Sequence, residues 1–169
     1  SRGVAWYWHD FTAPANPHAG GRYLLKFWAV QFRAQVWLNN IQLGTHDGGE
    51  EAFVFDATSV ILPGQSNRLA VRVIVPGDTP IEGLVFSEIP FRHYDGGIWD
   101  SVELIVAPAL YIDDVFVRPN PANGIIDVHA WVRNSGATTV TGSLTITVNP
   151  GGVQAQFTNL SFPSGVTQL

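Results

Sequence analysis

Apolar residues occur in short runs along the whole chain, and Gly, Pro, Asn or Asp bounds almost every run. The runs are rich in Val, Ile, Phe and Trp, which favour strands, and helical spacing is never sustained for more than a turn. This pattern predicts an all-β chain of antiparallel sandwich type. The expected strands lie at residues 3–9, 22–30, 34–39, 41–45, 51–56, 67–75, 98–106, 110–118, 125–133, 140–148 and 153–158.

Two turns follow from local chemistry. Asn39-Asn40 separates two apolar runs, and a type I′ hairpin needs positive φ at both central positions, which Asn tolerates. Pro63-Gly64 predicts a second tight turn. It precedes RLAVRVIV, residues 68–75, whose alternation places every second residue from position 69 on one apolar face.

One domain boundary is expected at Pro108, which follows the strand VELIVA. Composition changes beyond it, and residues 134–169 carry no charge at all. We therefore expect one domain over residues 1–108 and the start of a second sandwich over residues 109–169. An immunoglobulin-type sandwich needs about 100 residues and seven strands, so the second domain is expected to be incomplete.

Composition excludes several classes of function. Charged residues make up 14% of the chain, and the net charge is -5. An acidic, charge-poor surface argues against nucleic acid, and there is no polybasic or long apolar segment for a membrane. Cysteine is absent, which excludes disulfides and thiolate metal sites.

The segment His46-Asp47-Gly48-Gly49 admits two interpretations. A His-Asp pair could belong to a metal or acid/base site, but no second His or carboxylate lies close by at a ligand spacing. The favoured interpretation is a polar loop in which His46 and Asp47 satisfy backbone groups of the turn.

Trp6 and Trp8 share one face of the first expected strand, and Tyr7 lies on the other. If exposed, the two indoles would form a stacking platform for a sugar ring. If buried, they would be core or domain-interface aromatics, which is the interpretation we favour.

The stretch GRYLLKFWAVQFRAQVWLNNIQLGTHDGGEEAFVFDAT, followed by LPGQSNRLAVRV, resembles the N-terminal sugar-binding domain of family 2 glycoside hydrolases. That family includes β-galactosidases, β-glucuronidases and β-mannosidases. Its pattern joins a Phe-bearing strand, an Ala-x-Val-Trp-like strand, an Asn-Gly hairpin, Gly, His-x-Gly-Gly, an aromatic and Asp-x-Thr. The matching positions are Phe27, Ala34, Val36, Trp37, Asn39, Gly44, His46, Gly48, Gly49, Phe53, Phe55, Asp56 and Thr58.

The resemblance continues further along the chain. GGIWDSVELI matches the family's Gly-Ile-aromatic-x-x-Val-x-Leu, and YIDDVFVRP resembles the strand that opens its immunoglobulin-like domain. The implied fold is a jelly-roll, galactose-binding-domain-like β-sandwich over residues 1–108, followed by a truncated immunoglobulin-like β-sandwich over residues 109–169.

The resemblance also implies a parent enzyme that hydrolyses O-glycosyl bonds with a (β/α)8 barrel, whose acid/base glutamate follows an asparagine. This sequence contains no Asn-Glu dipeptide and no strand–helix alternation. We therefore expect this fragment alone to be non-catalytic and to scaffold the barrel of the same polypeptide. No cofactor is expected, and no carboxylate cluster is dense enough to predict a metal such as Ca²⁺.

Glycoside hydrolysis usually needs two carboxyl groups, about 5–5.5 Å apart in retaining enzymes. No carboxyl here has the apolar flanks that would raise its pKa into the working range. The carboxyls considered are Glu50, Glu51, Glu82, Glu88, Asp95, Asp100, Glu103, Asp113 and Asp114.

The segment IEGLVFSEIPFRHYDGG, residues 81–97, is too long and irregular for a hairpin turn. By resemblance it lies near the substrate pocket of the barrel, although only Ile89-Pro90 match the Ile-Pro-His-Gly-Lys-Gln of some members, and Asp100 stands where many have Arg. The alternative is a domain-interface or solvated loop. The candidate substrate-binding residues, chosen for hydrogen bonding to sugar hydroxyls and for an aromatic face, are Glu82, Glu88, Arg92, His93, Tyr94 and Asp95.

Three functions remain open from the sequence. The first is the accessory domain pair of a family 2 glycosidase, which would bind carbohydrate only weakly and partner the C-terminal catalytic barrel. The second is a free-standing carbohydrate-binding module, and the third is a structural or adhesive β-domain. The uncharged tail also predicts self-association through the truncated second domain, with a neighbouring chain ordering the tail, because an uncharged sheet edge invites strand addition.

Overall fold

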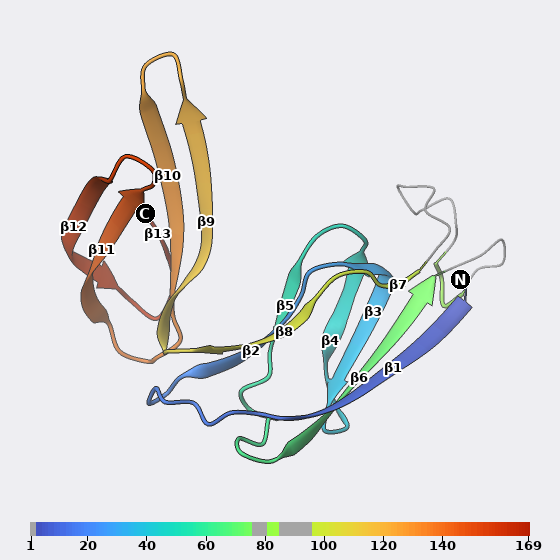
Figure 1. The fold of residues 1–169 in the computed structure, drawn as a ribbon. Coiled ribbons are helices and arrows are strands. Elements are labelled where there is room, and N and C mark those ends of the chain that lie inside the picture. The colour runs from blue at the N-terminus through green and yellow to red at the C-terminus, as the bar shows by residue number, and fades with distance from the viewer. Residues whose placement is uncertain (1–2, 76–80, 85–95) are drawn as a thin grey trace. The chain divides into compact units, whose positions relative to one another are not determined.

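The computed structural model describes residues 3–75, 81–84 and 96–169, and the regular structure in these ranges is β-strand, as predicted (Figure 1). The strands are β1 (Gly3–Thr12), β2 (Arg22–Phe27), β3 (Val30–Leu38), β4 (Ile41–Gly48), β5 (Phe53–Asp56), β6 (Ser66–Val75), β7 (Gly97–Ile98), β8 (Val102–Ala107), β9 (Leu110–Asn120), β10 (Ile125–Asn134), β11 (Val140–Val148), β12 (Val153–Phe162) and β13 (Gly165–Gln168).

One predicted strand is divided into two in the structure, and one strand of the structure was not predicted. The expected strand 98–106 is divided into β7 and β8, because the chain between them bonds to the β2–β3 connection: the Trp99 amide donates to the Ala29 carbonyl, and the Trp28 amide donates to the Ser101 carbonyl. Strand β13 was not predicted, because its four residues contain a single large apolar side chain, Val166.

The chain forms two compact units. The first comprises Ser1–Asn16 and Arg22–Val106, and the second comprises Pro17–Gly21 and Ala107–Leu169.

The first unit is a β-sandwich. One sheet has the strand order β1-β6-β3-β4, with β7 paired to β3, and the other has the order β5-β2-β8. Alternation along β6 sends Leu69, Val71 and Val73 into the core, as predicted, where they meet Leu25 and Phe27 of the facing sheet. The outer face of this five-stranded sheet is the surface on which the candidate site lies.

The hairpin between β3 and β4 has the predicted chemistry, with φ of 51° at Asn39 and 67° at Asn40. The Asn39 side chain also ties the turn to the neighbouring loop: its Nδ2 donates to the Val60 carbonyl at 3.0 Å and to the Asn67 side-chain oxygen at 2.8 Å. The Arg68 amide donates to Asn39 Oδ1 at 3.0 Å, which fixes the end of β3 against β6.

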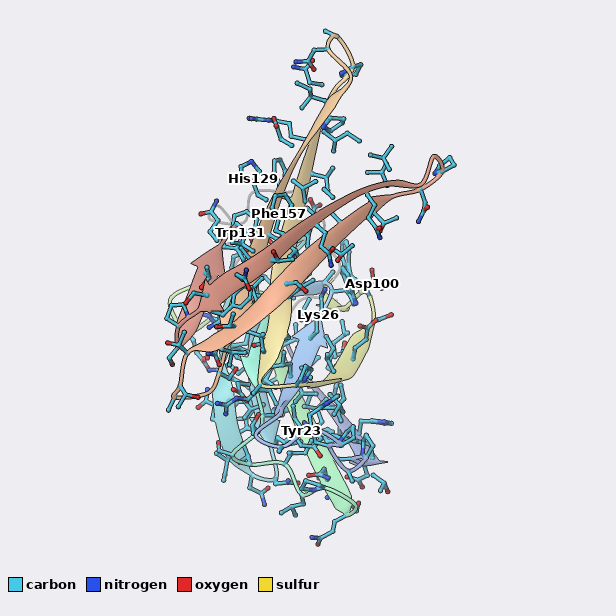
Figure 2. All side chains as sticks on the ribbon, turned by 90° about the vertical axis from the view of Figure 1, so that its left-hand side faces the viewer. Tyr23, Lys26, Asp100, His129, Trp131 and Phe157 are labelled. Atoms are coloured by element: carbon cyan, nitrogen blue, oxygen red, sulfur yellow. The ribbon has the colours of Figure 1, made fainter. Side chains whose placement is uncertain are left out.

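The second unit has a three-stranded sheet, β13-β10-β9, and a two-stranded sheet, β11-β12. Alternation on β10 buries Ala130 and Val132, while His129 and Trp131 lie on its other face with ring centroids 6.3 Å apart (Figure 2). Buried Asn134 donates to the Phe162 carbonyl at 2.9 Å and so joins β10 to β12.

The uncharged tail pairs within its own chain. Strand β12 pairs with β11, and β13 pairs with β10. Strands of the same unit therefore pair with the tail, and the expectation that a neighbouring chain orders it stays a prediction. Self-association through this unit stays a prediction.

Candidate functional site

Of the six candidate substrate-binding residues, Glu82 lies within the described chain; Glu88, Arg92, His93, Tyr94 and Asp95 lie outside it. Glu82 has a φ of 50° and sits in a short turn closed by a bridge between Ile81 and Leu84. Its carboxylate forms an ion pair with Arg72 of β6, and Arg72 Nη1 donates to Glu82 Oε2 at 3.0 Å. Glu82 therefore holds the start of the 81–97 segment on the sheet.

A second ion pair lies beside the first on the outer face of the sheet. Arg33 of β3 makes two hydrogen bonds of 2.6 Å to Asp47, its cross-strand neighbour on β4, and also reaches the Glu82 carbonyl at 3.4 Å. We call Arg33, Asp47, Arg72 and Glu82 the ion-pair cluster. The hydrogen bonds from Arg33 lower the pKa of Asp47, and those from Arg72 lower the pKa of Glu82.

The pair Arg33–Asp47 predicts a pH-dependent contribution to stability. Because the pKa of Asp47 is depressed in the folded state, its contribution is complete above the unfolded-state pKa of about 3.9 and is lost as pH falls through the folded-state pKa. We expect Asp47→Asn to lower the free energy of unfolding at pH 7 by about 0.5–1 kcal/mol, since solvent screens this half-exposed pair. Urea denaturation across pH 2–7 measures it.

The control for this experiment is Glu50→Gln, which changes an exposed turn carboxyl. Glu50→Gln should leave the free energy of unfolding almost unchanged across pH 2–7. A difference between wild type and Asp47→Asn that stays the same in size at the acid end of the range would show that the charge of Asp47 is not its source.

The interpretation of His46-Asp47 as a polar loop is wrong, because both residues belong to β4. Alternation turns Asp47 outward to Arg33 and turns His46 inward, where its ring stacks on Phe53 at 4.1 Å. A Cβ at Gly49 would overlap the side-chain oxygen of Gln31, which accounts for the second glycine. The segment is therefore a packed corner of the sandwich.

The interpretation of Trp6 and Trp8 as core aromatics is also wrong, and their place in a domain interface stays a prediction. Trp6 is 44% exposed and Trp8 is 63% exposed, on the outer face of β1. Their rings are nearly parallel, at 10°, with centroids 5.7 Å apart. Trp37 of β3 joins them, since its ring lies 5.3 Å from that of Trp6. Sequence reasoning did not link Trp37 to this set, because the connection depends on strand register.

A hollow of about 320 Å³ lies among these indoles, and we call it the indole groove. Ala70 of β6 stands directly between Trp8 and Trp37 in the strand register, so a short side chain separates two large ones. The residues that line the groove are Trp6, Trp8, Trp37, Asn40, Arg68 and Ala70.

The groove adjoins a second, polar hollow of about 370 Å³, because Asn40 and Arg68 line both. Asp10 and Ser66 also line this second hollow. Arg68 makes two hydrogen bonds of 2.7 Å to Asp10, its cross-strand neighbour, and these lower the pKa of the Asp10 carboxyl. Hydrogen-bond donors and acceptors therefore border one end of the indole groove.

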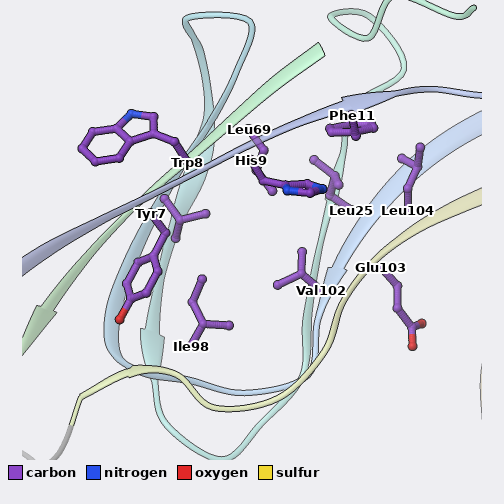
Figure 3. Close-up of a pocket in the computed structure, with 11 residues that line it drawn as sticks. Tyr7, Trp8, His9, Phe11, Leu25, Leu69, Ile98, Val102, Glu103 and Leu104 are labelled. Atoms are coloured by element: carbon purple, nitrogen blue, oxygen red, sulfur yellow. The ribbon is translucent and has the colours of Figure 1, made fainter. Parts of the chain in front are cut away.

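A cavity of about 460 Å³, which Trp8 also lines, extends on the opposite side of β1 (Figure 3). Tyr7 and His9 line it, and Figure 3 shows the Trp8 ring on the other side of the strand from these two. Its other walls are mainly apolar, with Leu25, Ile98 and Val102 among them. Glu103 adds a carboxylate to the polar groups of Tyr7 and His9.

No acid/base pair emerges from the described carboxyls. The carboxyl pKa values that are shifted, those of Asp10, Asp47 and Glu82, all fall, whereas a general acid needs a raised pKa. Within residues 3–75, 81–84 and 96–169, no group of three or more His, Asp or Glu is placed to hold a metal ion. The same ranges contain no helix with the length and apolar character that crossing a membrane requires.

No protein-family model matches the chain. A β-glucuronidase from Paenibacillus borealis is 34% identical over 131 residues, which cover 68% of this chain and 22% of that protein. A β-glucuronidase from Felis catus is 26% identical over 154 residues, or 78% of this chain and 24% of that protein. The chain thus spans about a quarter of the length of the curated relatives it matches.

Solved structures show the same fold. A β-galacturonidase of glycoside hydrolase family 2 from Eisenbergiella tayi, bound to galacturonate, has a TM-score of 0.78 and 19% sequence identity. The match covers 99% of this chain and 28% of that one. The chain belongs to glycoside hydrolase family 2, which confirms the family predicted from the motifs.

Proposed function

We propose that this chain is the non-catalytic N-terminal part of a family 2 glycosidase, and that it supports a (β/α)8 barrel of the same polypeptide. The observation that carries the proposal is coverage: the match extends over most of this chain but only about a quarter of each relative.

The parent protein would hydrolyse O-glycosyl bonds. The curated relatives are named β-glucuronidase, so a β-glucuronide is the first substrate to test. In this proposal residues 109–169 form part of an immunoglobulin-like sandwich between the first domain and the barrel.

The ion-pair cluster has a defined part in this proposal. Because Arg72 occupies the Glu82 carboxylate, Glu82 is better suited to hold the 81–97 segment than to bind a sugar hydroxyl directly. The remaining candidates, Glu88, Arg92, His93, Tyr94 and Asp95, would then form the wall of the barrel pocket. A wall without the rest of its pocket buries little of a ligand, which accounts for the weak binding expected here.

The chain alone is expected to hydrolyse no nitrophenyl glycoside, because the described carboxyls whose pKa is shifted, those of Asp10, Asp47 and Glu82, all shift downward, whereas a general acid needs a raised pKa. A panel of α- and β-linked nitrophenyl sugars, including the β-glucuronide, measures this. Turnover above background that disappears in a Glu88→Gln variant would contradict the proposal. Turnover unchanged in that variant would indicate a contaminating enzyme, and repurification should remove it.

A further inference from the structure

The outer face of the five-stranded sheet combines flat aromatic surface with a recess. Strand register places Trp8, Ala70 and Trp37 in one row across β1, β6 and β3, and the small Ala70 leaves the indole groove open. Soluble proteins seldom expose grouped large aromatics without a use for them. Trp8, at 63% exposed, is the most exposed of the three.

Indole faces favour a particular kind of ligand. The π face carries partial negative charge and attracts C–H groups that carry partial positive charge. A pyranose with all its hydroxyls equatorial presents such C–H groups on both faces of the ring. The exposed indoles of β1 and β3 can therefore contact a face of one sugar unit, whereas an axial hydroxyl on that face would disturb the contact.

The polar end of the indole groove offers room and hydrogen bonds for a second sugar unit. Arg68 keeps Nη1, which takes no part in its ion pair with Asp10, as a donor, Asn40 supplies both a donor and an acceptor, and the second hollow continues past these residues. The groove and the second hollow each exceed about 300 Å³, the lower end of the range for ligand sites. Asp10 neutralises Arg68, so the rim offers no free cation for an acidic sugar.

We propose that the indole groove is a carbohydrate-binding site for a neutral, gluco-configured oligosaccharide, with one pyranose among the indoles and the next over Arg68 and Asn40. The site does not depend on the barrel, on the 81–97 segment or on the function proposed above. It would let the domain hold a glycan chain at a surface apart from the pocket where hydrolysis occurs.

Titration of the full 169-residue chain with cellohexaose tests the proposal, by calorimetry and by tryptophan fluorescence. We expect a Kd of about 0.1–1 mM, typical of a shallow site that pays little ordering cost. Trp8→Ala should weaken binding about tenfold or more, since it removes one aromatic contact. Ala70→Leu should weaken it at least as much, because the larger side chain fills the groove and leaves every indole in place.

Trp28→Ala is the matched control, because Trp28 is 40% exposed and does not line the groove. It should bind like wild type, and a hexamer of galacturonic acid should bind more weakly than cellohexaose. No binding at about 10 mM cellohexaose, or equal loss in Trp28→Ala, would overturn the proposal. So would concentration-dependent self-association that Trp8→Ala abolishes, which would assign this face to a second copy of the chain.

Discussion

Phe27→Ala is expected to lower the free energy of unfolding of the first unit by about 3–5 kcal/mol. Phe27 is fully buried between the two sheets, and its ring stacks on Phe53 at 4.9 Å with 5° between the planes. Phe53 in turn stacks on His46. Phe27, Phe53 and His46 thus form a column of three rings, and removing the Phe27 ring leaves a cavity at its end. The neighbouring strands cannot close this cavity without breaking the backbone hydrogen bonds between them.

Denaturation of the first unit can be followed on its own. Five of the six tryptophans belong to the first unit, so a Trp131→Phe background confines the fluorescence signal to it. Val54→Ala, at a position of the same unit that is 48% exposed, serves as the control for truncation of an apolar side chain and should have little effect. A loss below about 1 kcal/mol for Phe27→Ala would mean that this column is not the centre of the core.

Asn67→Ala is expected to cost about 2–4 kcal/mol, because one buried amide serves four partners. Asn67 is 1% exposed; its Oδ1 accepts from the Leu62 amide and from Asn39 Nδ2, both at 2.8 Å. Its Nδ2 donates to the Leu62 and Gln65 carbonyls at 2.9 Å. Truncation removes the partner of the Leu62 amide and one of the partners of each of the other three groups, and the turn beside the indole groove loses its anchor.

Two further variants separate hydrogen bonding from volume in the same denaturation assay. Asn67→Asp keeps the size of the side chain but loses both donors, so it should also destabilise strongly. Asn40→Gly should be nearly neutral, because Gly adopts the positive φ of that position without strain. An Asn67→Asp variant as stable as wild type would show that the hydrogen bonds are not what Asn67 contributes.

Most of the strands could be predicted because their cause is local. Alternation on β6 and the two positive-φ asparagines follow from neighbouring residues, so the sequence shows them directly. The division between β7 and β8 could not be predicted from the sequence, because the hydrogen bonds that cause it come from the distant connection between β2 and β3.

The site was less predictable, because its residues meet only through register. Period two shows that Trp6 and Trp8 share a face, but not which face is buried. A signal was present in RLAVRVIV, since Arg68 and Arg72 mark the outer face of β6, and Asp10 lies on the Trp face of β1. Pairing β1 with β6 was needed to bring these three facts together.

The proposed supporting role is tested most directly by extending the reading frame beyond Leu169 and comparing the extended protein with a form that lacks residues 1–169. The proposal predicts a (β/α)8 barrel with an Asn-Glu pair, active on a β-glucuronide only when residues 1–169 are attached or added in trans. A barrel that is equally stable and active without these residues, or an extension that encodes no barrel, would contradict it.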